Sequence, residues 1–234
     1  MGMYKGEKMN TAANSKTKIY EVLIVDDHPI VRQGLRSLID QVDDLHVCGE
    51  AGSSGEALKS LAHLKPDLML VDISMKGPDG LELTKSARAL YPELPILVVS
   101  MHDESLYAER VLRAGASGYI MKEEVAQNIT EAAHKVLNGD IYISDHMRQK
   151  ILRGVAGQRS NAAATSVGRL SDRELEVFRL IGQGLGTRKI AEDLHLSIKT
   201  IETYRAHIKE KLGLQNATEL VRQAVQWVEQ QPAQ

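Results

Sequence analysis

The stretch Leu68-Met-Leu-Val-Asp-Ile-Ser-Met75 is an apolar run that is interrupted by one carboxylate, Asp72. A short apolar run of this kind is typical of a buried β-strand. Three more such runs end in polar groups, which are Asp26 with Asp27 after residues 22–25, Ser100 after residues 96–99, and Lys122 after residues 118–121. In open parallel sheets, ligands bind at the edge formed by the carboxyl ends of the strands. The sequence therefore predicts one site with three carboxylates, a hydroxyl and an ammonium group.

Helical patterns separate these runs and one more strand-like segment, residues 45–51, so strands and helices alternate five times between residues 19 and 140. Ser53-x-x-Glu56 is a capping box that opens one helix, and Gly115 and Gly139 close two others. Such alternation predicts an α/β doubly wound fold, with crossover helices on both faces of a parallel sheet. We expect the flavodoxin-like strand order 2-1-3-4-5, which places the first and third strand ends side by side.

Three carboxylates at one site need protons or a cation, because like charges raise each other's pKa. Hard oxygen ligands favour Mg²⁺, and an ammonium group such as that of Lys122 suits a phosphoryl oxygen. The chain contains neither a G-x-x-x-x-G-K-[ST] nor a G-x-G-x-x-G motif for nucleotide binding. We therefore expect transfer of a phosphoryl group onto Asp72 as the covalent acceptor.

Taken singly, an aspartate at a strand end is more commonly a helix cap or a turn residue. The ordered set of polar strand ends is what favours a functional site. A metal-dependent phosphohydrolase with Asp72 as its nucleophile is an alternative that the sheet would allow. Against it, the chain has no insertion that would form a substrate cap.

Residues 19–140 resemble the receiver domain of two-component response regulators. The resemblance rests on Asp26-Asp27, Asp72, Ser100 and Lys122, with Tyr119 three residues before the lysine. It implies that Asp72 is phosphorylated, that Ser100 follows the phosphoryl group, and that Tyr119 swings inward with it. It also implies that Asp27, Asp72 and the backbone carbonyl of Ser74 coordinate Mg²⁺, while Asp26 acts through water.

Two features near this site are less regular. Lys76 stands where receiver domains usually have proline, and Pro78 follows two residues later, which concerns the loop rather than the acceptor. His102 lies two residues beyond Ser100, where it either tunes dephosphorylation or is an exposed loop histidine.

The chain of 234 residues is long enough for two small domains, and its 43% hydrophobic and 26% charged residues are ordinary for a soluble globular protein. Its single cysteine, Cys48, excludes an intramolecular disulfide and fits a reducing compartment. No apolar run approaches the roughly 20 residues of a membrane helix, and residues 1–18 lack the apolar core of a signal peptide. We expect a cytoplasmic protein without membrane contact, with residues 1–18 as a disordered lead.

The net charge of −2 conceals an asymmetry between the two halves of the chain. Residues 145–234 carry 14 Lys and Arg against 10 Asp and Glu, whereas residues 1–144 carry 15 against 21. An acidic half and a mildly basic half suggest different partners, and the basic excess permits nucleic-acid binding without demonstrating it.

Residues 141–168 are predicted to connect two domains. Residues 145–155 fit a short helix, and residues 157–168 have the small, polar composition of a flexible linker. The pattern is helical from residue 169 to residue 231, with helix starts at Ser171-x-x-Glu174, Ser197 and Asn216-x-x-Glu219. We expect an all-α domain of four helices, of which two joined by a tight turn match a helix-turn-helix.

This second domain resembles the LuxR-type DNA-binding domain of the NarL/FixJ family of response regulators. The matching segments are Leu170-Ser-x-Arg-Glu-x-Glu-Val177, Gly184-Leu-Gly-Thr-Arg-Lys-Ile-Ala191, and Leu196-Ser-x-Lys-Thr-Ile-Glu-Thr203 through Lys211-Leu-Gly213. Gly186-Thr187 and Tyr204 depart from the commonest residues at their positions, without consequence for the fold.

By that resemblance, residues 198–212 form the recognition helix, with an apolar face toward the core and the other face toward the major groove of DNA. The expected phosphate contacts are Lys199, Thr200, Arg205 and Lys209, and the candidates for base edges are Glu202, Thr203 and His207. Each of these charges could equally belong to a solvated helix face. Val221, Ala224 and Val225 of the last helix are candidates for a dimer contact on DNA.

Together the two resemblances imply a transcription factor that is switched by phosphorylation, and not an enzyme beyond accepting and losing its own phosphoryl group. A sensor histidine kinase would phosphorylate Asp72 with Mg²⁺, and a homodimer would bind double-stranded promoter DNA. The alternative is a regulator that binds DNA independently of phosphorylation and uses its receiver only for docking. The clustered carboxylates argue against this alternative, since a docking module has no need of them.

Overall fold

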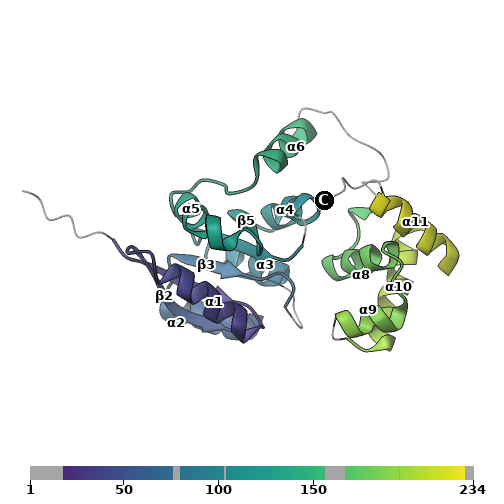
Figure 1. Ribbon diagram of the computed structural model, residues 1–234, viewed down its shortest axis with the longest axis horizontal. Helices are drawn as coiled ribbons and strands as arrows, with labels where there is room; N and C mark the ends of the chain where they lie inside the picture. The colour runs from purple at the N-terminus through teal and green to yellow at the C-terminus, as the bar shows by residue number, and fades with distance from the viewer. Residues whose placement is uncertain (1–17, 76–79, 103, 156–166, 195, 230–234) are drawn as a thin grey trace, which may run out of the picture. The chain divides into compact units, whose positions relative to one another are not determined.

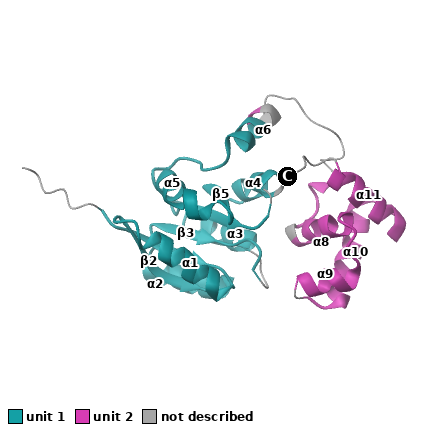
Figure 2. Ribbon diagram, in the orientation of Figure 1, with its two compact units in different colours: residues 1–151 teal, residues 152–234 magenta. Residues whose placement is uncertain are grey.

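The computed structural model describes residues 18–75, 80–102, 104–155, 167–194 and 196–229. The chain divides into two compact units, residues 1–151 and residues 152–234 (Figure 2). Three predicted features lie outside the described residues, namely residues 1–17 of the lead, the loop positions Lys76 and Pro78, and residues 156–166 of the linker.

The first unit contains a five-stranded sheet in which all neighbouring strands are parallel. Its strands are β1 (Tyr20–Val25), β2 (Leu45–Ala51), β3 (Leu68–Val71), β4 (Ile96–Ser100) and β5 (Gly118–Met121). Their order is β2-β1-β3-β4-β5, which confirms the predicted doubly wound, flavodoxin-like fold. Figure 1 labels β2, β3 and β5 of this sheet and the helices around it. Every residue of the inner strands β3 and β4 is buried. Burial on both faces explains why their sequences are almost continuously apolar.

Five helices connect and follow these strands, and they are α1 (Pro29–Ile39), α2 (Ser54–Leu64), α3 (Gly80–Leu90), α4 (Glu104–Arg113) and α5 (Val125–Leu137). Leu35 and Ile39 of α1 join Ile129 of α5 in a core cluster against one face of the sheet. α2 contacts α3, and right-handed crossovers place this pair on the opposite face. α4 ends at Arg113 and α5 ends at Leu137, each two residues before the glycine that was predicted to close it, Gly115 and Gly139.

The two ends of α2 show how local residues set its limits. Ser53 Oγ accepts the backbone N–H of Glu56 at 3.3 Å, as the predicted capping box requires. The Glu56 carboxylate, however, accepts from the backbone N–H of Gly52 at 2.8 Å, so the returning bond falls one residue earlier than predicted. The helix ends at Leu64, because Pro66 disfavours helical backbone at Lys65, which has a φ of 49°.

After α5 the chain returns to the edge of the sheet. Tyr142 forms a parallel bridge with Gly118 of β5, and α6 (Asp145–Val155) follows. This helix confirms the one predicted for residues 145–155. Ile143 and Met147 are buried, with 8% and 0% of their surface exposed, so the start of this segment packs on the receiver.

The described part of the second unit contains α8 (Asp172–Gly182), α9 (Thr187–Asp193), α10 (Ile198–Leu212) and α11 (Ala217–Glu229). Ser171 and Glu174 form the predicted capping box of α8, and the Ser197 side chain caps α10 by accepting from the backbone N–H of Thr200. α9 ends at Asp193. These helices confirm the all-α class of this unit.

α8 and α11 pack closely against each other. A Cβ on Gly182 would lie 2.4 Å from the carbonyl oxygen of Ala224, so glycine permits this approach. Ala224 is fully buried, which makes it wrong as a dimer contact, whereas Val221 on the same helix is 40% exposed. The rings of Phe178 and Trp227 lie 5.7 Å apart in this core.

Candidate functional site

The carboxyl ends of β1 and β3 bring two acidic side chains together. Val25 pairs with Val71, so Asp26 and Asp72 follow neighbouring strands at the same level of the sheet. The backbone N–H of Asp72 donates to the carbonyl oxygen of Val25 at 2.9 Å. Both carboxylates are almost completely buried, with 1% and 2% exposed. Sheet topology therefore pairs two charges that the chain separates widely.

Lys122 follows β5 and reaches both carboxylates. Its Nζ donates to Asp26 Oδ2 at 2.7 Å and to Asp72 Oδ2 at 2.9 Å. Burial alone would lower the pKa of Lys122, but the charge of Asp72 and the hydrogen bonds to both carboxylates raise it above its ordinary value. The ammonium group is therefore held in its charged form.

Burial is also the main influence on Asp72, and it raises the pKa of this carboxyl above its ordinary value. Two donors act against this rise, namely Lys122 and the backbone N–H of Ser74, which is 2.9 Å from Asp72 Oδ1. The like charge of Asp26 raises the pKa of Asp72 further. The ionised form of Asp72 would therefore gain from a further cation at this edge of the sheet.

Asp27 and His28 extend the acidic pair to a group of four possible metal ligands. One ligand atom from each of Asp26, Asp27, His28 and Asp72 lies within 4.8 Å of the others. His28 Nδ1 is 2.9 Å from Asp27 Oδ1, and the backbone N–H of His28 donates to Asp26 Oδ1 at 2.7 Å. His28 is not among the residues that the sequence pattern singles out, although its place directly after two aspartates is a signal.

The donor set fits Mg²⁺. Three of the four ligand groups are carboxylates, whose hard oxygens this ion prefers. Among the described residues, Lys122 supplies one ammonium against three carboxylates, so a divalent cation would balance the remaining negative charge. The imidazole of His28 is 53% exposed and is the least suitable of the four for this ion.

The loop after β4 is tied to the site at His102. The backbone N–H of His102 donates to Ser100 Oγ at 3.1 Å, and its carbonyl oxygen accepts from the Tyr119 hydroxyl at 2.7 Å. Ser100 and Tyr119 are buried, so the tyrosine lies inside in this structure. The two residues expected to respond to a phosphoryl group thus hold the same loop residue.

The side chain of His102 contacts Ser74, two residues after Asp72. Its Nε2 lies 2.9 Å from Ser74 Oγ, and its ring stacks on Tyr107 with the ring centroids 4.6 Å apart. His102 is half-buried, so it is not a freely exposed loop residue. Pairing with Ser74 could not be predicted from spacing, because the two residues follow different strands.

α10 presents all seven residues that were expected to meet DNA. Four are exposed, namely Lys199, Glu202, Thr203 and His207, and three are half-buried, namely Thr200, Arg205 and Lys209. Ile201 and Ile208 are fully buried, so the apolar face of the helix turns to the core as predicted.

Two threonines of α10 have hydrogen bonds within the helix. Thr203 Oγ1 donates to the carbonyl oxygen of Lys199 at 3.0 Å. Thr200 Oγ1 lies 2.8 Å from Ser197 Oγ, and the backbone N–H of Thr200 donates to the same serine at 3.0 Å. Thr200 therefore helps to form the start of α10, which limits its freedom to contact phosphate.

Glu174 holds the last turn of α10. Its carboxylate is 4% exposed and accepts from Lys211 Nζ at 2.7 Å and from the backbone N–H of Ser171 at 2.6 Å. Burial would raise the pKa of Glu174, but the bonds from Lys211 and Ser171 outweigh it and hold the pKa below its ordinary value. Lys211 therefore stabilises the packing of α10 against α8.

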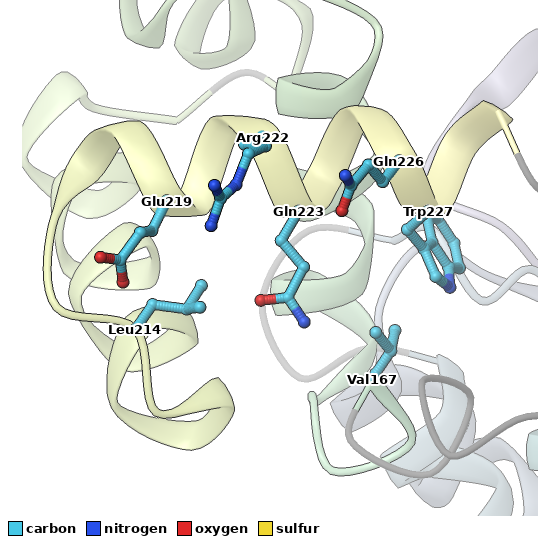
Figure 3. A pocket seen from close by; sticks show the side chains of 7 residues that line it. All are labelled: Val167, Leu214, Glu219, Arg222, Gln223, Gln226 and Trp227. Atoms are coloured by element: carbon cyan, nitrogen blue, oxygen red, sulfur yellow. The ribbon is translucent and has the colours of Figure 1, made fainter.

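A hollow of about 200 Å³ lies along α11 (Figure 3). It is lined by Val167, Leu214, Glu219, Arg222, Gln223, Gln226 and Trp227. Glu219 is engaged at the start of α11, where it accepts from the backbone N–H of Gln215 at 2.8 Å. The residues that line the hollow include neither a nucleophile nor a group of metal ligands. The strand ends of the first unit therefore remain the site with defined chemistry.

Comparison with known proteins matches each unit to a family. Residues 22–134 match the family model of the response regulator receiver domain, and residues 168–224 match that of the bacterial regulatory proteins of the luxR family. Oxygen regulatory protein NreC of Staphylococcus carnosus is 35% identical over 209 residues, which cover 88% of this chain and 96% of NreC.

Solved structures of the response regulator RcsB are also similar to this chain. A structure of RcsB from Salmonella typhimurium has a TM-score of 0.59 and 28% identity, and the match covers 89% of this chain and 98% of RcsB. RcsB bound to a promoter in the presence of the phosphomimetic BeF₃⁻, from Salmonella enterica serovar Typhimurium, has a TM-score of 0.57 and 28% identity over 88% of this chain and 98% of that chain.

A doubly wound receiver with acidic strand ends, followed by a helix-turn-helix unit, defines a two-component response regulator. The chain belongs to the NarL/FixJ family of these regulators, which carry a LuxR-type DNA-binding domain. Its family consists of DNA-binding transcriptional regulators and not of classical enzymes, which counts against the phosphohydrolase alternative. Within the part of the chain that the structure describes, no helix is long and apolar enough to cross a membrane.

Proposed function

We propose that this regulator is switched by phosphorylation of Asp72, with Mg²⁺ as cofactor and a sensor histidine kinase as donor. The proposal is carried by the contacts of the Lys122 ammonium with the buried carboxylates of Asp26 and Asp72, at 2.7 and 2.9 Å. A cation at the carboxyl ends of the strands is well placed to neutralise phosphoryl oxygens. A domain that served only for docking would gain nothing from clustered carboxylates.

In the proposed step, a carboxylate oxygen of Asp72 attacks the phosphorus of the donor. The P–N bond of a phosphohistidine on the kinase breaks as the new P–O bond forms, and the electron pair leaves with the histidine. Asp72 must be ionised to attack. Lys122 and the backbone N–H of Ser74 favour that form against the effect of burial.

Asp27, Asp72 and the backbone carbonyl of Ser74 would hold Mg²⁺, with Asp26 acting through water. When bound, the ion supplies positive charge to the phosphoryl oxygens. Lys122 would exchange a carboxylate contact for one of those oxygens. The phosphoryl group would then lie beside Asp26, Asp72 and Lys122, which already contact one another at the sheet edge.

Ser100 and Tyr119 would transmit the change. If the Ser100 hydroxyl turns toward the phosphoryl group, the backbone N–H of His102 loses the acceptor that it has at 3.1 Å. The Tyr119 hydroxyl donates to the carbonyl oxygen of His102. A movement of His102 would therefore change its hydrogen bonds with Ser100 and with Tyr119 together. Phosphorylation can shift this equilibrium only as far as it stabilises one arrangement over the other.

For DNA binding, we propose that α10 lies in the major groove of a promoter and that a homodimer binds two half-sites. The residues proposed to contact phosphates are Lys199, Thr200, Arg205 and Lys209, and those proposed for base edges are Glu202, Thr203 and His207. Four of them, namely Lys199, Glu202, Thr203 and His207, are exposed on α10, which supports the assignment. The likeness to RcsB bound to a promoter supports it as well.

The test is a titration of genomic DNA fragments at fixed salt with Mg²⁺, in the presence and absence of acetyl phosphate. Wild type should bind more tightly with the donor, and Asp72→Asn should not respond. Asp140→Asn, which changes an exposed aspartate, is the matched control and should behave as wild type. If wild type and Asp72→Asn bind alike whatever the donor, DNA binding stands but the switch does not, and the receiver is a docking module.

A further inference from the structure

The segment that follows α5 is fastened to the proposed switch residue Tyr119. Tyr142 lies beside β5, where its carbonyl oxygen accepts the backbone N–H of Tyr119 at 2.8 Å and its own N–H donates to Ser117 at 3.1 Å. A Cβ on Gly118 would lie 2.7 Å from the carbonyl oxygen of Tyr142, so glycine permits this approach. Tyr119 thus contacts this segment through its backbone and His102 through its hydroxyl.

The same segment is bound to the start of α4. The Glu104 carboxylate accepts from the backbone N–H of Ser144 at 2.8 Å and from the Ser144 hydroxyl. Ser144 also begins α6, because its Oγ accepts the backbone N–H of Met147 at 3.1 Å. Lys150 Nζ adds a bond to the carbonyl oxygen of Ser105 at 2.8 Å. The side chains of Glu104, Ser144 and Lys150 therefore join the start of α4 to the N-terminal half of α6.

We call residues 142–147 the strap. Both of its attachments involve neighbours of His102, because Tyr142 accepts from the backbone of Tyr119, whose hydroxyl donates to the His102 carbonyl oxygen, and Glu104 lies two residues after His102 in the chain. Its apolar side chains add to the fastening, because Ile143 and Met147 are buried. The strap includes the first three residues of α6, and residues 145–151 of this helix are the last of the first unit before the chain enters the second.

We propose that the strap couples the acceptor site to α6, and that phosphorylation of Asp72 loosens the contact between Glu104 and Ser144. This inference rests on the proposed function, because it takes the movement of Ser100 as its input. Loss of the Ser100 acceptor frees the N–H of His102, and Glu104 follows two residues later in the chain. Release of α6 then lengthens the free segment that connects the receiver to the DNA-binding unit. The signal is therefore transmitted through the covalent connection between the two units.

The test uses the full chain and the variant Glu104→Ala, which removes the carboxylate but leaves the Ser144 cap of α6. Hydrogen exchange at residues 145–151 is measured by mass spectrometry with Mg²⁺, before and after acetyl phosphate, and Asp72 phosphorylation is measured in the same samples. In wild type the donor should accelerate exchange about tenfold. In Glu104→Ala exchange should be fast already, with a donor effect below about twofold. DNA binding without donor should tighten toward the phosphorylated value.

Glu109→Ala is the matched control, because it removes an exposed carboxylate from the same helix, where its partner is Arg113. It should behave as wild type. Gly118→Ala is a second variant, which displaces Tyr142 from the β5 side and should reproduce Glu104→Ala.

Two results would overturn the inference, and they differ in what else they overturn. If Asp72 is phosphorylated in wild type and Glu104→Ala alike and α6 exchanges equally in both, the strap is not a relay and the proposed function stands. If wild type takes up no phosphoryl group, the proposed function fails and the relay fails with it.

Discussion

Lys211 Nζ, in the last turn of α10, lies 2.7 Å from the carboxylate of Glu174, which also closes the capping box of α8. Glu174 is buried and Lys211 is 41% exposed. This ion pair attaches the proposed recognition helix to α8. The placement of α10 depends on a residue that lies outside it.

Lys211→Met should destabilise the second unit by about 1–3 kcal/mol, because the buried carboxylate of Glu174 loses a charged donor. Chemical unfolding followed by the fluorescence of Trp227 measures this effect, since Trp227 is the only tryptophan and lies in this unit. Lys189→Met is the control, as Lys189 pairs with Asp193 on the surface and its loss should cost much less. Equal unfolding midpoints for the two variants would contradict the structural role of the pair.

The stability of the second unit should also depend on pH through Glu174. Burial raises the pKa of this carboxyl, but Lys211 and Ser171 outweigh burial and lower it. The unfolded chain then binds the proton more tightly, so this stabilisation is complete above the ordinary glutamate value of about 4.3 and is lost as the pH falls through the folded pKa. Glu174→Gln should flatten the pH dependence of the unfolding free energy in this acid range. An unchanged slope would assign the dependence to other carboxyl groups.

Two substitutions at the acidic strand ends should change Mg²⁺ affinity in opposite directions. Asp27→Asn should weaken binding by about tenfold or more, because it removes a carboxylate ligand. Lys122→Met should tighten binding, because its ammonium no longer competes with the ion for Asp26 and Asp72. Titration calorimetry measures both, with Asp43→Asn as a control at an exposed aspartate. A loss of affinity in Lys122→Met would show that Mg²⁺ binds elsewhere.

Lys209 and Glu202 of α10 should affect DNA binding in different ways. Lys209→Met should weaken binding to all sequences and reduce the salt slope by about 1, as expected for a phosphate contact. Glu202→Ala should instead relax preference at one base pair, by about 1–3 kcal/mol. Titrations at several salt concentrations, against the preferred fragment and its single-base variants, separate the two. A change in base preference without a change in slope for Lys209→Met would reverse the assignments.

Much of the first unit was predictable because its signals are local. An apolar run of four to six residues, followed by an acidic or polar residue, marks both a strand and the side chain at its end, as in β3 with Asp72. General rules for crossover connections then yield the strand order, and this order brings Asp26 next to Asp72. Capping residues such as Ser171 and Glu174 likewise act on their own helix, so helix starts were predicted well.

Contacts between distant elements were not predictable in the same way. Ala224 has the spacing of a surface seam, yet Gly182 lets α8 approach so closely that Ala224 is buried in its own unit. His102 contacts Ser74 because β3 and β4 are neighbours in the sheet, and Glu104 contacts Ser144 because the segment after α5 lies beside β5.

Local sequence patterns were enough to predict two units, the class of each unit and the strand-end residues that include the proposed acceptor Asp72, because hydrophobic period, caps and polar strand ends are properties of neighbouring residues. Tertiary structure alone decided that Lys122 bridges two carboxylates, that Lys211 is committed to Glu174, and that the strap is fastened beside Tyr119. Such pairs depend on register, on rotamers and on the distance between packed elements. No local pattern along the chain encodes these quantities.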